Sequence, residues 1–273
     1  MSSNVPQPLP AEFAEPLARA AGRLGAFGRH ILWYPEVPST NDVAAALAER
    51  GAGEGCVVAA NAQSAGRGRH GRPWASPAGA GLYVSTVLRP GRHAVPALTI
   101  AAGVAVGEGI QGATGLDVGL KWPNDVYVGD RKLAGVLAEA SAGADPVGPP
   151  DRIQYVVLGF GINVMPAPYP PDIAARATSL EEELGRAVDR GLLLAECLSA
   201  LARRYGDLQG GRTGAVIEAW RRRAARTLGR RVRWDADGST IEGVAENIDD
   251  TGALMVRTPA GVIAVTAGEV RWV

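Results

Sequence analysis

The chain has 273 residues, of which 47% are hydrophobic and 21% are charged. This composition is typical of a soluble globular protein, and the length accommodates one large domain and one small domain. The 28 basic residues balance the 28 acidic residues, so the net charge is zero. This balance excludes a global field that would attract nucleic acid or a membrane, and any electrostatic function is expected to be local.

Cysteine and histidine are few and scattered. Cys56 and Cys197 are far apart and form no C-x-x-C pair. This spacing argues against a disulfide scaffold and suits a reducing compartment. His30, His70 and His93 are also well separated, so we predict no zinc site and no other metal-binding cluster.

No targeting or membrane segment is apparent. Residues 1–10 contain three prolines and no basic patch followed by an apolar run, so they are predicted to form a flexible tail. The most apolar stretch, residues 94–109, contains Glu108 and is shorter than the ~20 residues needed to cross a bilayer. We therefore expect a cytoplasmic protein without a membrane or nucleic-acid partner.

The first predicted elements are a short helix over residues 12–24 and a strand over residues 30–34. Together with the tail, residues 1–28 are assigned to an N-terminal segment. Only about thirty residues precede the strand, too few for a separate DNA-binding module of ~50 residues or more. A helix then begins at Ser39 or Thr40, either of which can cap it, and ends before Gly51.

The middle of the chain alternates β-rich runs with helical patterns. Helices are predicted over residues 95–111, 192–205 and 215–226, and strands over residues 56–60, 82–88, 118–121, 126–128, 133–139 and 154–159. Residues 143–150 and 166–171 are rich in proline and are predicted to be loops. Residues 29–227 are therefore expected to form one α+β domain, a mixed sheet flanked by helices.

The last segment has a different character. Short alternating strands are predicted over residues 231–234, 240–245, 253–258, 262–266 and 269–272. Turns such as Asp237-Gly238 and Thr251-Gly252 separate them. We predict a small SH3-like β-barrel over residues 228–273.

The most informative stretch of the chain is residues 66–74, which read GRGRHGRPW. The spelling G-x-G-x-x-G matches the dinucleotide fingerprint, but Pro73 and Pro77 lie where the required helix would run. A P-loop is also excluded, because Arg72-Pro73 stands where Lys-Ser/Thr is required. What remains is a cationic flap whose glycines allow the backbone to approach an anion. The alternative is a solvated basic turn.

A second cationic cluster lies at residues 121–125, KWPND, and continues through residues 130–135, DRKLAG. Lys121 and Lys132 can contact a phosphate or carboxylate, and Asp125 can orient an amine or accept its proton. The alternative is an exposed hairpin with Lys132 in solvent. Two such clusters in a chain without net positive charge favour a site for a strongly anionic ligand.

Five motifs, in this order, resemble those of the biotin protein ligases. They are Ser39-Thr40-Asn41, Gln63 with the flap, Lys121-Trp122-Pro123-Asn124-Asp125, Arg131-Lys132-Leu133-Ala134-Gly135 and Gly159-Phe160-Gly161-Ile162-Asn163. The resemblance extends from Ser39 to the C-terminal barrel. It implies a mixed sheet related to class II aminoacyl-tRNA synthetases with an SH3-like cap. It also implies that biotin reacts with MgATP to give biotinyl-5′-AMP, from which a lysine of a biotin carboxyl carrier protein takes the biotinyl group.

The resemblance also implies residue roles. Catalytic roles fall to Lys132, Arg69 and Asp125. The implied biotin-binding residues are Ser39, Thr40, Asn41, Gln63, Gly66, Arg67, Gly68, Arg69, Lys132, Gly135, Leu137 and Gly159. The implied ATP- or AMP-binding residues are Arg67, Arg69, Arg72, Trp74, Lys121, Asn124, Lys132, Asn163 and Arg271. Trp74 would offer a face to adenine, and Gly135 and Gly159 would leave room beside biotin.

Some alternatives stay open at the level of sequence. A lipoate protein ligase would share the fold and the adenylation chemistry, although its Arg-Arg/Gly-Gly-Gly signature is missing from this chain. A non-catalytic binding module would explain the barrel but not the flap or the lysines. Some biotin ligases also repress transcription through an N-terminal DNA-binding module; we expect a ligase only. A homodimer is possible.

Overall fold

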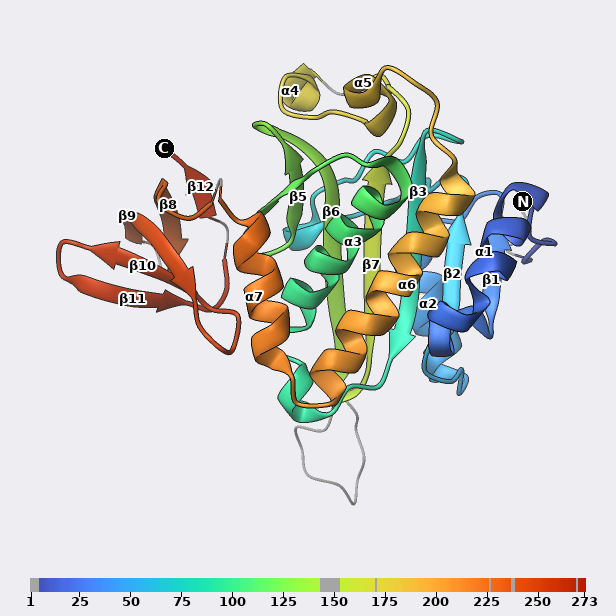
Figure 1. The fold of residues 1–273 in the computed structure, drawn as a ribbon, viewed down its shortest axis with the longest axis horizontal. Coiled ribbons are helices and arrows are strands. Elements are labelled where there is room, and N and C mark those ends of the chain that lie inside the picture. Colours follow the sequence, from blue (N-terminus) through green and yellow to red (C-terminus); the bar gives the residue numbers. More distant parts are fainter. Residues whose placement is uncertain (1–4, 143–152, 170, 226, 237–238, 269) are drawn as a thin grey trace.

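A computed structural model describes residues 5–142, 153–169, 171–225, 227–236, 239–268 and 270–273. The predicted loop at residues 143–150 and the predicted turn Asp237-Gly238 lie outside the described residues, as do residues 1–4 of the predicted tail. The described chain forms a large helix-flanked sheet and a smaller sheet beside it (Figure 1). The two sheets correspond to the two kinds of sequence pattern predicted above. No helix among the described residues is long and apolar enough to cross a bilayer.

The large sheet has seven strands in the order β1-β2-β3-β7-β6-β5-β4. The strands are β1 (Ile31–Tyr34), β2 (Val57–Ala60), β3 (Gly81–Leu88), β4 (Gly119–Lys121), β5 (Asp125–Val128), β6 (Arg131–Ala142) and β7 (Ile153–Asn163). Strands β1 and β2 pair in parallel and all other neighbours are antiparallel, so the sheet is mixed, as predicted. Strands β3, β7 and β6 are the longest strands of this sheet and lie at its centre.

Helices cover the sheet unequally. The seven α-helices of the described residues are α1 (Ala11–Leu24), α2 (Thr40–Glu49), α3 (Leu98–Thr114), α4 (Pro171–Ala174), α5 (Leu180–Leu184), α6 (Arg190–Gln209) and α7 (Thr213–Arg223). Helices α1, α3, α6 and α7 lie across one face (Figure 1), where they share a single apolar core with the sheet. Helix α2 packs on the opposite face in a separate, smaller core. Much of that second face is left uncovered by helices.

The predicted helices are confirmed with shifted ends. The helix predicted at residues 95–111 runs three residues later, because the 3₁₀ turn η3 (Arg92–Ala94) precedes it. Helix α5 was missed, since five residues are too few to show helical periodicity. Its N-terminus is capped by Ser179, whose hydroxyl accepts a hydrogen bond from Glu182 N. The predicted loop at residues 166–171 ends in the single turn of α4.

Strand alternation decides which residues face the helices and which face the open side. On β7, Val156, Leu158, Phe160 and Ile162 belong to the helix-side core, so Gly159 and Gly161 face the other way. On β6, Ala134 and Val136 belong to the same core, which places Gly135, Leu137 and Glu139 on the open side. The pairings Gly135↔Gly161 and Leu137↔Gly159 set these residues next to one another. The glycines make this part of the open face poor in side-chain volume.

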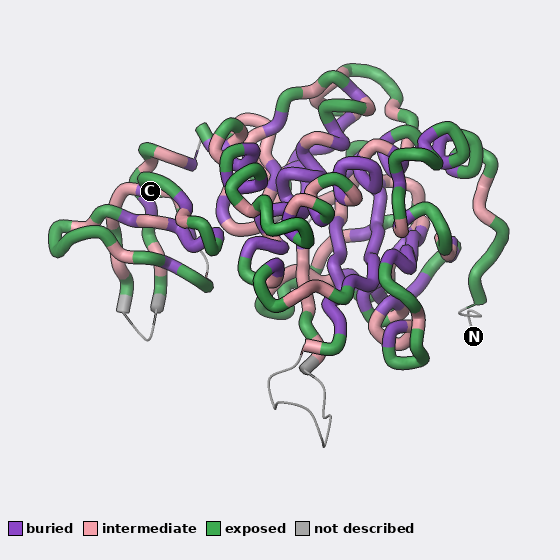
Figure 2. Tube along the Cα trace, turned by 60° about the horizontal axis from the view of Figure 1, so that its bottom comes forward, coloured by how far each residue is buried: buried purple, intermediate pink, exposed green. Residues whose placement is uncertain are grey.

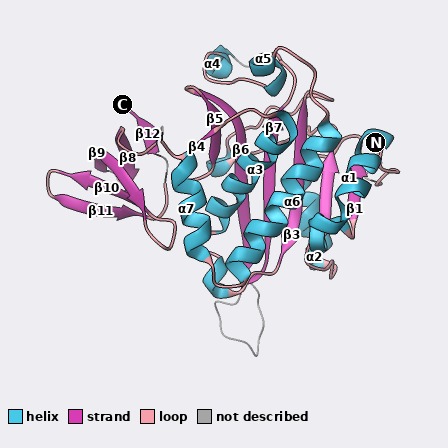
Figure 3. Cartoon of the chain, in the orientation of Figure 1, coloured by secondary structure: helices cyan, strands magenta, loops and turns pink. Residues whose placement is uncertain are grey.

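The C-terminal segment forms a five-stranded antiparallel sheet in the order β11-β10-β9-β8-β12 (Figure 3). Its strands are β8 (Arg231–Ala236), β9 (Ser239–Ile248), β10 (Leu254–Thr258), β11 (Gly261–Val265) and β12 (Val270–Trp272). A hydrogen bond joins it to the hairpin β4-β5: Trp122 Nε1 donates to Gly252 O at 2.8 Å. Just before the barrel, Thr227 Oγ1 donates to Leu120 O of the same hairpin at 2.6 Å. The barrel is thereby fixed to the KWPND motif.

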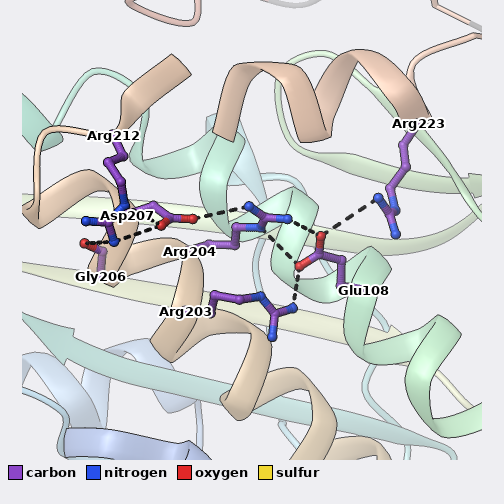
Figure 4. A network of polar contacts seen from close by, with 7 residues as sticks. All are labelled: Glu108, Arg203, Arg204, Gly206, Asp207, Arg212 and Arg223. Carbon is purple, nitrogen blue, oxygen red and sulfur yellow. Dashed lines mark hydrogen bonds and ion pairs between the residues drawn. The ribbon is translucent and has the colours of Figure 1, made fainter. Parts of the chain in front are cut away.

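The buried residues concentrate between the large sheet and its helices, while the barrel is mostly exposed or half-buried (Figure 2). Within the helical layer, Glu108 of α3 accepts hydrogen bonds from Arg203 and Arg204 of α6 (Figure 4). Arg223 Nη1 of α7 lies 3.9 Å from Glu108 Oε1. Asp207 forms ion pairs with both Arg204 and Arg212. This polar network ties three helices together at the edge of the apolar core.

Candidate active site

A cavity of about 540 Å³ opens on the side of the sheet opposite the helical layer. The flap, the N-terminus of α2, the hairpin β4-β5, strands β6 and β7 and the last strand of the barrel all contribute to its wall. Every residue predicted to act in catalysis or binding lines it except Gly66. The predicted residues in the wall are Ser39, Thr40, Asn41, Gln63, Arg67, Gly68, Arg69, Arg72, Trp74, Lys121, Asn124, Asp125, Lys132, Gly135, Leu137, Gly159, Asn163 and Arg271.

Gly66 has a different place from the one predicted. Its carbonyl oxygen accepts a hydrogen bond from Trp74 N at 2.8 Å, which closes the base of the flap. A Cβ on Gly66 would lie 2.7 Å from both Trp74 O and Ser76 Oγ, so no larger residue fits. Gly66 therefore shapes the flap from behind, and its predicted direct contact with a ligand is not supported by its position.

The flap lies between β2 and β3 and contains no α-helix, in agreement with the exclusion of a dinucleotide fingerprint. Its centre is the 3₁₀ turn η2 (Arg69–Gly71), where His70 has a left-handed φ of 56°. Gly68 N donates to Arg72 O at 2.8 Å across this turn. The backbone thus folds into a short hairpin that places arginine side chains in the cavity wall.

Arg67 is already paired in this structure. Its Nη2 lies 2.7 Å from Asp42 Oδ1 and 3.0 Å from Glu139 Oε2. The hydrogen bond with Asp42, and then those with Glu139, raise the pKa of the guanidinium despite its partial burial. Two carboxylates therefore balance this charge, which favours a role in fixing the flap over the predicted contact with phosphate. Neither Asp42 nor Glu139 was predicted as a site residue.

The N-terminus of α2 is organised by a buried polar network. Gln63 Oε1 accepts from Thr40 N at 2.8 Å, which satisfies a backbone donor that the helix itself leaves open. Ser39 occupies the N-cap position but makes no side-chain cap bond, because Gln63 takes that part. Gln63 Nε2 donates to Ser76 Oγ at 2.9 Å, and Ser85 Oγ lies 2.7 Å from Thr40 Oγ1. Residues predicted to bind biotin are thus held in fixed orientations.

The space beside Gly159 is filled by a protein side chain. A Cβ on Gly159 would overlap Asn41 Oδ1, which in turn accepts a hydrogen bond from Ser85 Oγ at 2.5 Å. Asn41 Nδ2 donates to Glu139 Oε2 at 2.6 Å. Gly159 was predicted to leave room beside biotin; here it leaves room for Asn41 to connect β3 and β6.

Lys132 and Asp125 form the charged centre of the cavity. Lys132 Nζ lies 2.6 Å from Asp125 Oδ1, and both side chains are partly exposed, by 32% and 20%. Arg69 approaches the same hairpin, with Nη1 3.5 Å from Asn124 Oδ1. Residues 119–135, which carry Lys121 and Lys132 on β4, β5 and the start of β6, are called the lysine hairpin below. The flap and the lysine hairpin therefore converge on one cavity. The structure thus differs from the alternative of an exposed hairpin with Lys132 in solvent, because Lys132 lies in the cavity wall and pairs with Asp125.

Trp74 lies on the paired glycines of β6 and β7. A Cβ on Gly161 would be 2.6 Å from Trp74 Nε1, and a Cβ on Gly135 would be 3.3 Å from the same indole. Lys132 Nζ lies 5.3 Å from the centre of the indole ring, within cation–π distance. The room left by Gly135 is thus taken by Trp74 and Lys132. Trp74 Nε1 is buried and has no hydrogen-bond partner among the residues that the structure describes.

Two predicted amides have structural partners. Asn124 Nδ2 donates to Val136 O at 2.7 Å, and Asn163 Nδ2 donates to Thr178 O at 2.9 Å. Both residues line the cavity, so their side-chain oxygens are the groups they can direct to a ligand. Asn163 is 8% exposed and stands at the end of β7.

Sequence reasoning missed several residues of the wall. Tyr169 lines the cavity with a buried hydroxyl group that has no hydrogen-bond partner within the described part of the chain. Burial, followed by the charge of Glu182, raises the pKa of Tyr169 to about 12. Trp272 and Tyr127 also line the cavity. None of these three residues belongs to a motif, and only their aromatic character beside a motif or at a strand end offered a signal.

The cavity offers no ready metal cage. Among the described residues no three His, Cys, Asp or Glu side chains cluster closely enough to hold an ion. Of the carboxylates in its wall, Asp125 is engaged by Lys132 and Asp130 by Arg230. A cation is therefore expected to reach this site with a ligand that supplies its own oxygen atoms.

Comparison with known proteins agrees with this geometry. Residues 33–163 match the biotin/lipoate A/B protein ligase family, and residues 227–271 match the biotin protein ligase C terminal domain. The chain is 38% identical to the biotin--[acetyl-CoA-carboxylase] ligase of Paracoccus denitrificans, over 85% of this chain and 96% of that protein. It is 37% identical to the enzyme of the same name from Mycobacterium tuberculosis, over 90% of both chains.

A solved structure gives the same result at the level of the fold. The biotin protein ligase from Aquifex aeolicus, in complex with biotin and ATP, aligns with a TM-score of 0.77 and 28% identity. The alignment covers 90% of this chain and 99% of that chain. The helix-flanked mixed sheet, the C-terminal sheet and both sequence matches lead to one assignment. This chain belongs to the biotin protein ligase family.

Proposed function

We propose that the protein joins biotin to a lysine of a biotin carboxyl carrier protein, at the expense of MgATP. The observation that supports this function best is the meeting of the arginine flap and the lysine hairpin on one cavity of about 540 Å³. A cavity of this size accommodates a small organic acid together with a nucleotide. The carrier protein belongs to acetyl-CoA carboxylase or to a related carboxylase, as the names of the relatives suggest.

In the first step a biotin carboxylate oxygen attacks the α-phosphorus of ATP. A new O–P bond forms, the bond between the α-phosphorus and the bridging oxygen breaks, and pyrophosphate leaves. Negative charge gathers where the carboxylate and phosphates meet, and Lys132 and Arg69 face this region to stabilise it. Lys121, Arg72 and Arg271 form the outer cationic wall for the nucleotide, with Trp74 as its aromatic face.

In the second step the carrier lysine attacks the biotinyl carbonyl carbon. A C–N bond forms, the C–O bond to AMP breaks, and the amine loses a proton. A free lysine has a pKa of about 10.4, so it must be deprotonated and oriented before attack. We assign this role to Asp125; its ion pair with the Lys132 ammonium group, at 2.6 Å, supports the assignment because it shows that the carboxylate can hold an amine.

Mg²⁺ enters this scheme as part of the substrate. The ATP phosphates and water supply most of its ligands, as is usual for Mg²⁺ bound with nucleotides. Asp125 and Asp130 are the carboxylates of the cavity wall that would assist in holding it.

The function is tested by mixing the protein with MgATP, biotin and a carrier domain and measuring the mass of the carrier by mass spectrometry. The expected result is a mass gain equal to one biotinyl group on one carrier lysine, with release of AMP and pyrophosphate. A parallel assay with lipoate in place of biotin tests for the activity of a lipoate protein ligase, the alternative left open by the sequence. Modification by lipoate and not by biotin would overturn the proposal.

The flap is tested separately by Arg69→Gly. If Arg69 retains the adenylate, this variant should release biotinyl-5′-AMP and biotinylate bystander proteins about tenfold or more above the wild type. The only lysines of the chain are Lys121 and Lys132, so the label should appear on an added lysine-rich protein rather than on the enzyme surface. Arg92→Gly, a basic residue outside the cavity, is the matched control. Strict labelling of the carrier alone would contradict a retaining role for Arg69.

A further inference from the structure

We propose that Trp272, in the last strand of the barrel, is a positioning residue that holds the Lys121 ammonium group at the nucleotide side of the cavity. The proposal rests on the function proposed above and deepens it. It makes the barrel a part of the active site rather than an attached module. Both Trp272 and Lys121 line the cavity.

The contact itself is a cation–π interaction. Lys121 Nζ lies 4.6 Å from the centre of the Trp272 ring and 5.5 Å from that of Tyr127. The two rings are 5.1 Å apart and tilted by 52°, so they form a corner beside the ammonium group. Tyr127 belongs to the same hairpin as Lys121, whereas Trp272 is supplied by the barrel.

Trp272 is itself fixed from a second direction. The Arg230 guanidinium lies 4.5 Å from the Trp272 ring centre, and its Nη2 is 3.0 Å from Asp130 Oδ1. Asp130 stands between β5 and β6, next to the lysine hairpin. The hydrogen bond from Trp122 to Gly252 O anchors the same hairpin to the barrel. The indole is thus clamped between barrel and sheet.

This clamp suits a lysine that must meet a phosphate. A lysine side chain has four rotatable bonds and pays rotamer entropy when it is ordered. A fixed ring that attracts the ammonium group restricts these rotamers before the ligand arrives, which lowers the cost of binding. The ring attracts the ammonium group through its π face and adds no formal charge of its own.

The test uses three variants of the full-length protein. Trp272→Leu removes the ring, Trp272→Phe restores an aromatic face, and Trp234→Leu removes a tryptophan of the same barrel that lies outside the cavity. We expect Trp272→Leu to lower kcat/KM for ATP about 5- to 20-fold, in line with a partly desolvated cation–π pair, and to leave KM for biotin unchanged. Trp272→Phe should stay within about threefold of the wild type, and Trp234→Leu within about twofold.

Coupling to Lys121 is the decisive part. In a Lys121→Met background, Trp272→Leu should cost less than about twofold more, because the group that it positions is gone. Full additivity of the two changes would overturn the proposal. So would an equal loss of activity in Trp234→Leu, which would point to general damage to the barrel.

A spectroscopic readout separates this inference from the proposed function. With ¹³C-labelled lysine the protein gives signals from two residues only, Lys121 and Lys132. The Lys121 side-chain signals should be shifted by the aromatic ring current in the wild type and in Trp234→Leu, and should move toward free-lysine values in Trp272→Leu. An unchanged Lys121 spectrum in Trp272→Leu would refute the contact, whatever reaction the protein performs.

Discussion

Arginines meet carboxylates in two regions of this molecule, and the two regions differ in what surrounds them. In the helical layer, Glu108 and Arg204 are each 12% exposed and lie between packed helices. In the flap, Arg67 is 30% exposed and stands on a glycine-rich hairpin beside a cavity. The chemistry of the ion pairs is the same, but the second region has a cavity next to the charges, whereas the first lies between packed helices. Arginine content alone therefore does not identify a ligand site.

This contrast has a consequence for experiments. Changes in the cavity should alter turnover and leave the free energy of unfolding nearly unchanged, because these groups face a space for ligand. Changes in the helical layer should do the reverse, since Glu108 and Arg204 are largely desolvated and pair with each other. A variant that affects both properties equally would weaken the distinction.

The largest effect is expected for Lys132→Ala. Removing a cation from the place where carboxylate and phosphates meet should slow adenylate formation about 10²- to 10³-fold. The thermal midpoint should change little, because Lys132 is 32% exposed and makes one ion pair. Pyrophosphate release with biotin and ATP gives the rate, and a thermal melt gives the stability.

The control for Lys132→Ala is its neighbour Arg131→Ala. Arg131 points away from the cavity and pairs with Glu182 and Glu183 of α5. Its loss should leave adenylate formation within about threefold of the wild type. Wild-type rates in purified Lys132→Ala would remove Lys132 from the mechanism.

Much of the difference between the cavity and the helical layer could be predicted from the sequence. The flap and the KWPND hairpin combine charge with glycine or proline, and this combination predicted loops beside strands that share one cavity. The alternation on β7 was not predicted, because the predicted strand ended at Gly159, before the buried Phe160 and Gly161. Helix α3 was recognisable as buried from its apolar composition alone.

The remaining features depend on contacts between distant segments. Asp42 and Glu139 are 97 positions apart (139 minus 42), and nothing local indicates that they share Arg67. Gly135 and Gly159 were predicted to leave room for a ligand, whereas folding brings Trp74 and Asn41 into those spaces. Trp272 reaches Lys121 only because the barrel docks on the hairpin.

A smaller effect, on stability, is expected for Glu108→Gln. This change removes one of the two charged partners of the Arg204 guanidinium and leaves Asp207 as the other. It should lower the free energy of unfolding by about 2–3 kcal/mol, somewhat less than the ~3–5 kcal/mol of a fully buried pair. Denaturant titration measures this loss. Adenylate formation at 25 °C should remain within about twofold of the wild type. Glu15→Gln, whose partner Arg19 is exposed, is the control and should cost about 0.5 kcal/mol or less.

The same network predicts a dependence on pH. Burial alone would raise the pKa of the Glu108 carboxyl, but hydrogen bonds from Arg204 and Arg203 outweigh burial and lower it. A lowered folded-state pKa means that the contribution is complete above the unfolded value of about 4.3 and is lost as the pH falls through the folded value. The stability gap between wild type and Glu108→Gln should therefore narrow in acid. A gap that stays constant down to pH 3 would contradict the assignment.

The smallest effect compares two glycines, one from each region. A Cβ on Gly161 would lie 2.6 Å from Trp74 Nε1, whereas a Cβ on Gly103 of α3 has no heavy atom within 4 Å outside the neighbouring turns of its own helix. Gly161→Ala should push the indole off the sheet, because the flap yields more easily than paired strands, and should lower kcat/KM for ATP about tenfold. Gly103→Ala should leave activity unchanged and stabilise the helix by up to about 1 kcal/mol. Full activity in Gly161→Ala together with impaired activity in Gly103→Ala would contradict the assignment of catalysis to the cavity and of stability to the helical layer.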